Sequence, residues 1–356
     1  MTIFSIIFAI LLFSLIIFVH ELGHFLAAKL SKVQVNEFSM FMGPAIFKKQ
    51  VGETLYSIRC IPIGGYCAME GEDEDTDNPR SFQKAAWWKR LVILVAGSFM
   101  NLVIGFVLLL VFFSFSNYRQ TAEIVYVDPA CSIVSEEGLH LGDRFVQIDG
   151  YRIFTASDAH MLLEFGGETM DLVIDRDGQR VVFDDYPMEK HAFVNAETGE
   201  EELRYGFSFG AEELTGDMLF SYTVDNTCSV VQSVWLSLKM LLTGKAGFGD
   251  MMGPVGIVKV MSDTASSAES LGTAILSMVY FGGFIAINLA VMNMLPIPAL
   301  DGGRCVGLLL TTVIEKITGK KLDAKYEGYV HGIGMILLLI LMAIIMFKDV
   351  FGIFKG

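Results

Sequence analysis

Residues 1–30 read MTIFSIIFAILLFSLIIFVHELGHFLAAKL, an apolar run in which every ionisable side chain lies at or after His20. A helix of about 20 apolar residues is long enough to cross a bilayer. The run has no basic n-region and no small-residue cleavage pattern, so it does not resemble a signal peptide. We therefore interpret it as a retained membrane helix.

Within this run, His20-Glu-Leu-Gly-His24 has the spacing of a zinc-binding helix. Residues four apart share one helix face, so both imidazoles can reach one Zn²⁺, and Glu21 beside them can accept a proton from a water that the metal activates. Ionisable groups without partners are costly inside a bilayer, which favours a functional role for these three. The alternative is that the two histidines are ordinary polar core groups.

A third protein ligand is expected, because two histidines leave a zinc site incomplete. The candidate is Asp301, within residues 293–303, NMLPIPALDGG. Two prolines break an apolar stretch there, and irregular backbone at membrane depth must be buried by protein or line a wet cavity. We predict that Asp301 completes the metal site; the alternative is an Asp-Gly turn at a helix end.

Asn293 begins this proline-broken segment, eight residues before Asp301. Its amide could donate to a scissile carbonyl as that oxygen becomes negative, which is the role of an oxyanion donor. A helix-packing amide, common in membranes, is an equal alternative. We interpret Asn288 and Asn101 as packing amides.

The composition is that of an integral membrane protein. The 356 residues are 53% hydrophobic and 19% charged, with a mean hydropathy of +0.52, which is too apolar for a soluble enzyme of this length. The net charge of −14 argues against a nucleic-acid partner. Five cysteines without a CxxC pair predict free thiols and no disulfide framework.

We predict a polytopic α-helical membrane protein with about four transmembrane helices, placed at residues 1–30, 91–115, 271–303 and 331–352. The segments between them are expected to be a loop with a membrane-dipping hairpin at 31–90, a β-rich domain at 118–213, an interfacial amphipathic segment at 214–270 and a loop at 304–330. Within the interfacial segment, residues 230–242 are apolar but too short and too polar to span.

The distribution of lysine and arginine predicts the orientation in the lipid bilayer. Basic residues concentrate in the loops after the first and third spans, which the positive-inside rule assigns to the cytoplasm. Both termini and the β-rich domain are then extracytoplasmic. The first and third spans run in the same direction, so their late residues, which include His20 and His24, share a depth near the cytoplasmic side with Asp301.

The loop at 31–90 contains a candidate substrate-binding hairpin. Residues 54–59 alternate like a strand, and residues 61–66 are apolar and glycine-rich. An added strand would hold a substrate unwound and expose the carbonyls that a helix hides. The hypothesis names five substrate-binding residues, Leu55, Ser57, Gly64, Gly65 and Tyr66; a short surface hairpin is the equal alternative.

These motifs together resemble the site-2 protease family of intramembrane zinc metalloproteases, most closely its bacterial branch with a PDZ insertion, which includes the sigma-E-regulating protease. The resemblance covers nearly the whole chain. It rests on five motifs that occur in this order: His20-Glu-Leu-Gly-His24, Phe41-Met-Gly43-Pro44, Ile61-Pro-Ile-Gly-Gly-Tyr66, Gly253-Pro-Val-Gly-Ile257 and the segment from Asn293 to Gly302.

The resemblance implies a zinc ion held by His20, His24 and Asp301, with Glu21 as general base and Asn293 assisting the substrate carbonyl. It implies a multi-pass protein of the bacterial cell (inner) membrane that acts in regulated intramembrane proteolysis. The implied substrates are single-span membrane proteins already trimmed outside, such as anti-sigma factors, and remnant signal peptides.

The β-rich domain looks like the family's circularly permuted PDZ module, through residues 137–144 and 147–150. Residues 128–136 depart from the usual proline- and alanine-rich approach, and a single domain is present where some relatives carry two. We therefore expect a size filter that blocks untrimmed substrates rather than a binder of peptide tails.

Two other classes of protein share part of this pattern. A membrane-anchored PDZ scaffold that cuts nothing could lose Glu21 or Asp301 without consequence, and this chain keeps both. A zinc transporter needs polar residues along a path through the membrane, whereas here they cluster near one side. The sequence therefore predicts a zinc metalloendopeptidase.

Overall fold

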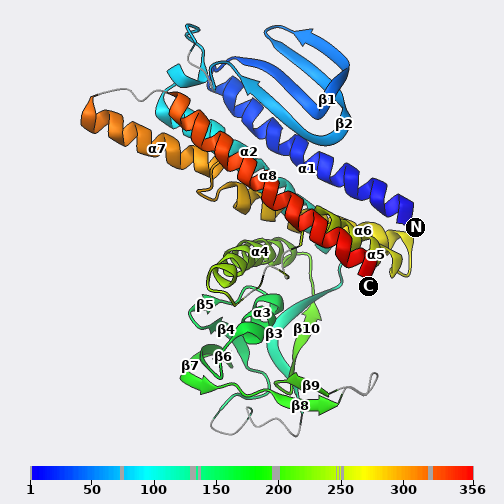
Figure 1. Cartoon of the computed structure of the whole chain (residues 1–356). Helices are drawn as coiled ribbons and strands as arrows, with labels where there is room; N and C mark the ends of the chain where they lie inside the picture. Colours follow the sequence, from blue (N-terminus) through cyan, green and yellow to red (C-terminus); the bar gives the residue numbers. More distant parts are fainter. Residues whose placement is uncertain are drawn as a thin grey trace. The chain divides into compact units, whose positions relative to one another are not determined.

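The computed structural model describes residues 2–72, 76–128, 134, 138–194, 201–245, 247, 249, 252–319 and 324–355. The chain forms two compact units, one made of residues 1–112 and 247–356 and the other of residues 113–246 (Figure 1). The first unit carries the long apolar helices and a β-hairpin. The second carries most of the remaining strands.

Among the described residues, four helices are long and apolar enough to cross a membrane, which confirms the expected number of spans. Their apolar side chains are largely exposed on the protein surface, as in Leu11, Phe99 and Ile336. Such a surface fits a lipid surround and not water. The four helices are α1 (Thr2–Leu30), α2 (Trp87–Phe113), α6 (Leu271–Asn293) and α8 (Ala324–Lys355).

Glycines bring these helices into close contact. A Cβ on Gly105 of α2 would lie 2.6 Å from Cγ1 of Ile287 in α6, and a Cβ on Gly282 of α6 would lie 2.5 Å from a methyl group of Leu12 in α1. Small residues allow the helices to approach closely, and the resulting van der Waals contacts stabilise their packing in lipid, where no hydrophobic driving force acts between helices. Helices α1, α2 and α6 are therefore closely packed.

Strands β1 (Val35–Val51) and β2 (Thr54–Met69) form an antiparallel hairpin beside α1 (Figure 1). Both strands bend, so the pairing runs through four segments in the order 61–69, 35–42, 54–59 and 45–51. The two edges of the hairpin are therefore residues 45–51 and 61–69.

This register corrects part of the substrate-binding hypothesis. Leu55 pairs with both Glu37 and Gln50, and Ser57 pairs with both Ser39 and Lys48. An added strand needs free backbone groups along an edge, so it cannot pair at Leu55 or Ser57. The sequence pattern identified a strand correctly but could not show that the hairpin folds back on both sides of it.

Two helices occupy regions where we expected other structures. Residues 301–318 form α7 (Asp301–Thr318), although most of them were expected in a loop; apolar residues at helical spacing outweigh the lysines that favoured the loop. In the segment 214–270, α4 (Leu219–Leu242) belongs to the second unit, whereas α5 (Pro254–Ser266) belongs to the first. That segment is therefore not one element.

The start of α5 is held to α8 by a carboxylate. The backbone N–H groups of Gly253 and Gly256 each donate to Oδ2 of Asp349 at 2.9 Å. A Cβ on Gly253 would lie 2.8 Å from that oxygen. The two glycines of the motif Gly253-Pro-Val-Gly-Ile257 therefore leave room for Asp349 to accept hydrogen bonds from amides at the helix N-terminus that would otherwise be unbonded.

The second unit is a twisted sheet covered by α3 (Ala156–Phe165) and α4. Its strands pair in the order β10-β3-β4-β6-β7, with β5 paired to β4 and a separate pair β8-β9. The bounds are β3 (Tyr118–Val127), β4 (Arg144–Ile148), β5 (Tyr151–Arg152), β6 (Thr169–Arg176), β7 (Gln179–Pro187), β8 (His191–Val194), β9 (Glu201–Arg204) and β10 (Phe207–Glu213).

One face of α4 packs on the core of this unit. Leu236 and Met240 are buried in the same cluster as Phe145 of β4 and Leu162 of α3, and Ser229 donates to the buried carboxylate of Asp158 at 2.7 Å. The amphipathic character of residues 230–242 is therefore explained by packing on the sheet. Of the residues on which the PDZ resemblance rests, Glu137 lies outside the described residues, as do residues 129–133 and 135–136 of the stretch that departs from the family pattern.

Four cysteines, Cys60, Cys67, Cys228 and Cys305, are free thiols, as predicted. Cys131 lies outside the described residues.

A three-membered ion-pair cluster fixes the turn of the hairpin. Oε1 of Glu53 lies 2.7 Å from Nζ of Lys29 at the end of α1, and Oε2 lies 2.6 Å from a guanidinium nitrogen of Arg80. The hydrogen bonds from Arg80 and Lys29 lower the pKa of Glu53 to about 2. A carboxyl whose pKa is lowered on folding stabilises the fold above its ordinary pKa and loses that effect as the pH falls.

We predict that the hairpin turn loosens as the pH falls from about 4.5, the ordinary pKa of the Glu53 carboxyl, towards 2. Glu53→Gln should weaken the turn at neutral pH by roughly 1 kcal/mol and remove this pH dependence. Hydrogen exchange of the amides at residues 52–54, corrected for intrinsic rates, measures both effects. Lys49→Gln, on the same hairpin but outside the cluster, is the control; a pH dependence that survives in Glu53→Gln would contradict the assignment.

Candidate metal centre

Three potential ligand atoms converge between α1 and the start of α7. Nε2 of His20 and Nε2 of His24 lie 3.2 Å apart, and each lies within 3.4 Å of Oδ2 of Asp301. The structure thus brings Asp301 to the two histidines, although it follows His24 by 277 residues in the chain. This is the ligand set expected from the sequence.

The backbone of α2 fixes the orientation of His24. Nδ1 of His24 lies 2.8 Å from the carbonyl oxygen of Ile93. A carbonyl only accepts, so Nδ1 carries the proton and Nε2 has a free lone pair that faces the other two ligand atoms. This arrangement, in which the second ring nitrogen donates to a carbonyl, is typical of metal-binding histidines.

Asn101 of α2 holds His20 in a similar way. Its amide nitrogen lies 3.3 Å from Nδ1 of His20, while its Oδ1 is buried without a partner. The two atoms of an amide are exchangeable by a 180° flip, and in the flipped orientation Oδ1 accepts a hydrogen bond from Nδ1–H of His20. The sequence indicates only a packing amide at Asn101, whereas the structure shows that this amide contacts a candidate metal ligand, His20.

Gly97, one helical turn before Asn101, makes room for the two imidazoles. A Cβ at Gly97 would lie 2.3 Å from Nε2 of His24 and 2.7 Å from Cε1 of His20. Any side chain there would fill the space between the ligands. The spacing Gly97-x-x-x-Asn101 on one helix face is the signal that could have identified this contact, although it cannot be told from ordinary helix packing.

The loop between α6 and α7 delivers Asp301 to the site. Ala299 has a φ of +79°, a left-handed conformation that costs free energy in a residue other than glycine. A Cβ on Gly303 would lie 2.2 Å from the carbonyl oxygen of Ile297. The two prolines and the two glycines therefore build a tight reversal that places Asp301 in the first turn of α7.

The donor set fits a divalent cation. Oδ2 of Asp301 is buried and accepts no hydrogen bond among the described residues. With Nδ1 protonated on the histidines, three lone pairs face one another at 3.2–3.4 Å with no proton between them. Such an arrangement is repulsive unless a cation binds all three, and two imidazoles with one carboxylate are a ligand set of catalytic zinc sites.

Glu21 lies beside this group without belonging to it. Its carboxylate accepts a hydrogen bond from the backbone N–H of Cys67 and is in electrostatic range of His20, His24 and Asp301. A Cβ on Gly65 would lie 3.4 Å from Cγ of Glu21. The edge segment of β2 therefore runs directly past the candidate general base, which places Gly65 at the site and leaves Leu55 and Ser57 inside the sheet.

Asn293 is the last residue of α6, half-buried. Among the described residues, its amide has no hydrogen-bond partner. The structure gives no contact between Asn293 and the three ligands, so its role stays a prediction.

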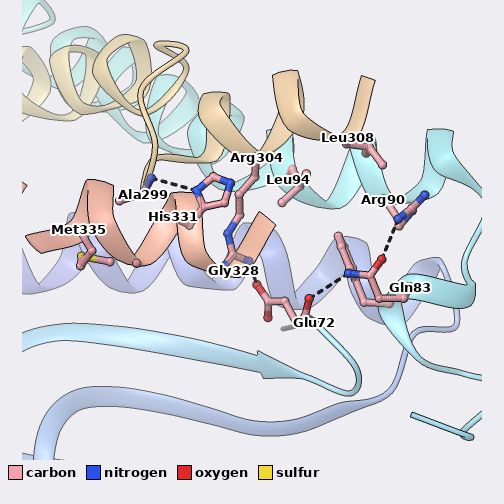
Figure 2. A pocket seen from close by; sticks show the side chains of 12 residues that line it. Glu72, Gln83, Arg90, Leu94, Ala299, Arg304, Leu308, Gly328, His331 and Met335 are labelled. Atoms are coloured by element: carbon pink, nitrogen blue, oxygen red, sulfur yellow. Dashed lines mark hydrogen bonds and ion pairs between the residues drawn. The ribbon is translucent and has the colours of Figure 1, made fainter. Parts of the chain in front are cut away.

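Helix α8 supports the loop that carries Asp301, a contact that the sequence did not indicate. Nδ1 of His331 accepts a hydrogen bond from the backbone N–H of Ala299 at 2.9 Å (Figure 2). Three residues along α8, a Cβ on Gly334 would lie 2.4 Å from Cβ of Pro298. One face of α8 thus holds the left-handed residue of the loop and packs against the proline beside it.

A cavity of about 320 Å³ lies next to this contact. Figure 2 shows Arg304 directed toward Glu72, and Gln83 bridging Glu72 and Arg90. The polar lining extends from the loop after α1 to Ala299 and Arg304, which flank Asp301 in the chain. Water can therefore bind to the charged part of this otherwise apolar cavity, close to the loop of the metal centre.

We predict that His331→Leu weakens zinc binding by roughly tenfold or more, the usual effect of losing an outer support of a metal ligand. His331→Asn should bind zinc nearly normally, because Oδ1 of asparagine can replace Nδ1 as the acceptor. Ala299→Gly should partly restore His331→Leu, since glycine tolerates the positive φ. Competition with a chelator measures the zinc affinity. Ile333→Ala, on the exposed face of α8, is the control; unchanged affinity in His331→Leu would contradict the role.

Comparison with known proteins agrees with this site. The model of Peptidase family M50 matches residues 8–341. A protein of Clostridium acetobutylicum named as a zinc metalloprotease is 35% identical over 356 residues, which cover 98% of both chains. The regulator of sigma-W protease RasP of Bacillus subtilis is 25% identical over 427 residues, which cover 96% of this chain and 97% of the relative. The chain therefore belongs to Peptidase family M50, the site-2 protease family of zinc metalloproteases.

Proposed function

We propose that this protein cleaves single-span membrane proteins within the bilayer, with Zn²⁺ held by His20, His24 and Asp301. The observation that carries the proposal is the convergence of these three ligand atoms, with Glu21 beside them, inside a helix apolar enough to span a membrane. A soluble protease has no need to place its metal there, whereas a protease for membrane segments does.

The chain's residues divide the chemistry of peptide hydrolysis among them. His20, His24 and Asp301 would hold the zinc ion, which would supply Lewis-acid activation of a water molecule and of the scissile carbonyl. Glu21 accepts the proton of the attacking water and gives it to the leaving amine. Asn293 donates from its amide to the carbonyl oxygen as that oxygen becomes negative; its lack of a hydrogen-bond partner among the described residues leaves the amide available.

The proposed substrates include anti-sigma factors and remnant signal peptides. The similarity to a relative named regulator of sigma-W protease supports the first class. In the proposed orientation the metal centre lies near the cytoplasmic side of the bacterial inner membrane, and both termini and the β-rich unit lie outside. The cavity bordered by Glu72, Gln83 and Arg304 would then admit cytoplasmic water.

We expect Glu21→Gln to retain zinc and to lose cleavage of a labelled single-span substrate by about 10²-fold or more, the usual contribution of a general base. Glutamine preserves the shape of the side chain but accepts no proton. Zinc content by mass spectrometry and gel-based cleavage of the purified proteins in detergent are the readouts. Asp301→Asn should lose zinc and cleavage together. Equal cleavage by the wild type and Glu21→Gln would refute the mechanism.

We further propose that the substrate pairs with the outer edge of β2 at residues 61–66, before Cys67, whose N–H already bonds Glu21. Gly64, Gly65 and Tyr66 lie on this edge, and Gly65 is adjacent to Glu21. A strand added there is extended and exposes its carbonyls next to the general base. Tyr66 is tied into the hairpin by a hydrogen bond with Arg59, which also bonds Glu37, so the edge is held rigid.

Disulfide trapping distinguishes the two edges of the hairpin. In a Glu21→Gln protein that also lacks Cys60, Ile61→Cys should cross-link to cysteines placed near the cleavage site of a substrate. Phe47→Cys, on the opposite edge, should not. Ile61 and Phe47 are similarly exposed, at 46% and 54%, so accessibility alone predicts equal trapping. Equal yields at the two positions would count against strand addition.

The β-rich unit is proposed to be the PDZ-like module of the family and to act as a size filter. Its position in the chain, between the spans α2 and α6, would place it at the extracytoplasmic entrance for substrates. A folded domain tethered there excludes bulky untrimmed ectodomains by volume alone.

A further inference from the structure

The second unit contains a polar cavity of about 510 Å³ that the proposed proteolysis does not use. Four guanidinium groups line it, from Arg119 on β3, Arg144 on β4, Arg152 on β5 and Arg180 on β7. The lining contains two carboxylates, Glu212 and Asp225. The cavity therefore carries an excess of positive charge, in a chain with a net charge of −14.

The carboxylates neutralise only part of this cluster. Glu212 bridges Arg119 at 2.9 Å and Arg144 at 3.3 Å, and Glu123 also pairs with Arg144 at 3.3 Å. Arg152 stacks over Phe154, with 5.0 Å between its guanidinium carbon and the ring centroid, and Arg180 has no ion-pair partner among the described residues. Nε of Arg119 is buried without a hydrogen-bond partner. Neither Arg152 nor Arg180 therefore has an ion-pair partner among the described residues, and both can donate to a ligand.

Chain connectivity keeps the cavity close to the end of a membrane span. Tyr222, which lines the cavity, packs on Phe113, the last residue of α2, with 4.7 Å between the ring centroids. Arg119 follows Phe113 by six residues, which bridge about 20 Å even when fully extended. Around this junction, Phe115, Tyr118 and Phe220 are each more than 60% exposed. Exposed aromatic rings beside a span are typical of the membrane–water interface.

We propose that this cavity binds the headgroup of a phospholipid with net negative charge, and that Arg152 and Arg180 hold its phosphate. Guanidinium groups bind phosphate oxygens through paired, charge-assisted hydrogen bonds. The volume suits a headgroup, and the bilayer supplies the ligand at high local concentration beside α2. Anchoring of this kind would tie the β-rich unit to the membrane surface, on whichever side it lies. The proposal does not depend on the proteolytic mechanism.

Native mass spectrometry of the full chain, released from detergent with phosphatidylglycerol or phosphatidylcholine of identical acyl chains, tests this site. The wild type should retain one phosphatidylglycerol with roughly tenfold preference. The double variant Arg152→Gln/Arg180→Gln should lose that preference, and the corresponding double lysine variant should keep part of it. These two arginines are chosen because their removal leaves the pairs of Glu212 intact. Arg204→Gln, in the same unit but outside the cavity, is the matched control.

The outcomes separate the possible ligands. Loss of phosphatidylglycerol in the glutamine double variant alone supports the proposal. Equal retention by all variants overturns it. Arginine-dependent binding of inorganic phosphate without a preference for phosphatidylglycerol overturns the lipid and assigns the cavity to a soluble phosphate. Arginine-dependent binding of an acidic peptide, again without lipid preference, assigns it to a protein partner and also overturns the proposal.

Discussion

The convergence of two imidazoles and a carboxylate requires α1, α2 and the loop between α6 and α7 to pack very closely inside an apolar environment. Oδ2 of Asp301 lies within 3.4 Å of both histidine Nε2 atoms, and only a glycine at position 97 lets α2 pass beside them. A bilayer offers such groups no water, so each must be satisfied by the protein or by a metal. The close packing of α1, α2 and the α6–α7 loop follows from that requirement.

Two helices, α2 and α8, hold the ligands and the loop that carries Asp301. His24 donates to the carbonyl of Ile93 and His20 contacts Asn101, both on α2. The loop before Asp301 is held by His331 on α8. Because the supports come from two helices, the geometry of the centre depends on the packing of the whole membrane unit. A substitution far from the metal can therefore alter its affinity through these contacts.

Local spacing explains which parts of the site could be predicted from the sequence. His20, Glu21 and His24 lie on one helix and reveal themselves by a four-residue period, and Asp301 is marked by the prolines that break its helix. Asn101 and His331 act across space, and no local period distinguishes them from packing residues. The edge of the hairpin was misplaced at Leu55 and Ser57 for the same reason, since the pairing partners that enclose them lie elsewhere in the chain.

Zinc-dependent peptide hydrolysis needs a held cation, water and an extended substrate, and a plain bundle of spanning helices supplies none of these. In this chain each need corresponds to a departure from regular helix. The break between α6 and α7 delivers the carboxylate, the loop between β2 and α2 borders a cavity with charged side chains in its lining, and the hairpin between α1 and α2 presents a strand edge at Glu21. All three departures lie in the unit that contains the metal centre. The β-rich unit takes no part in the chemistry, and its proposed roles are to filter substrates by size and to bind a lipid headgroup. This division explains how a membrane-spanning scaffold can host a reaction that its surroundings disfavour.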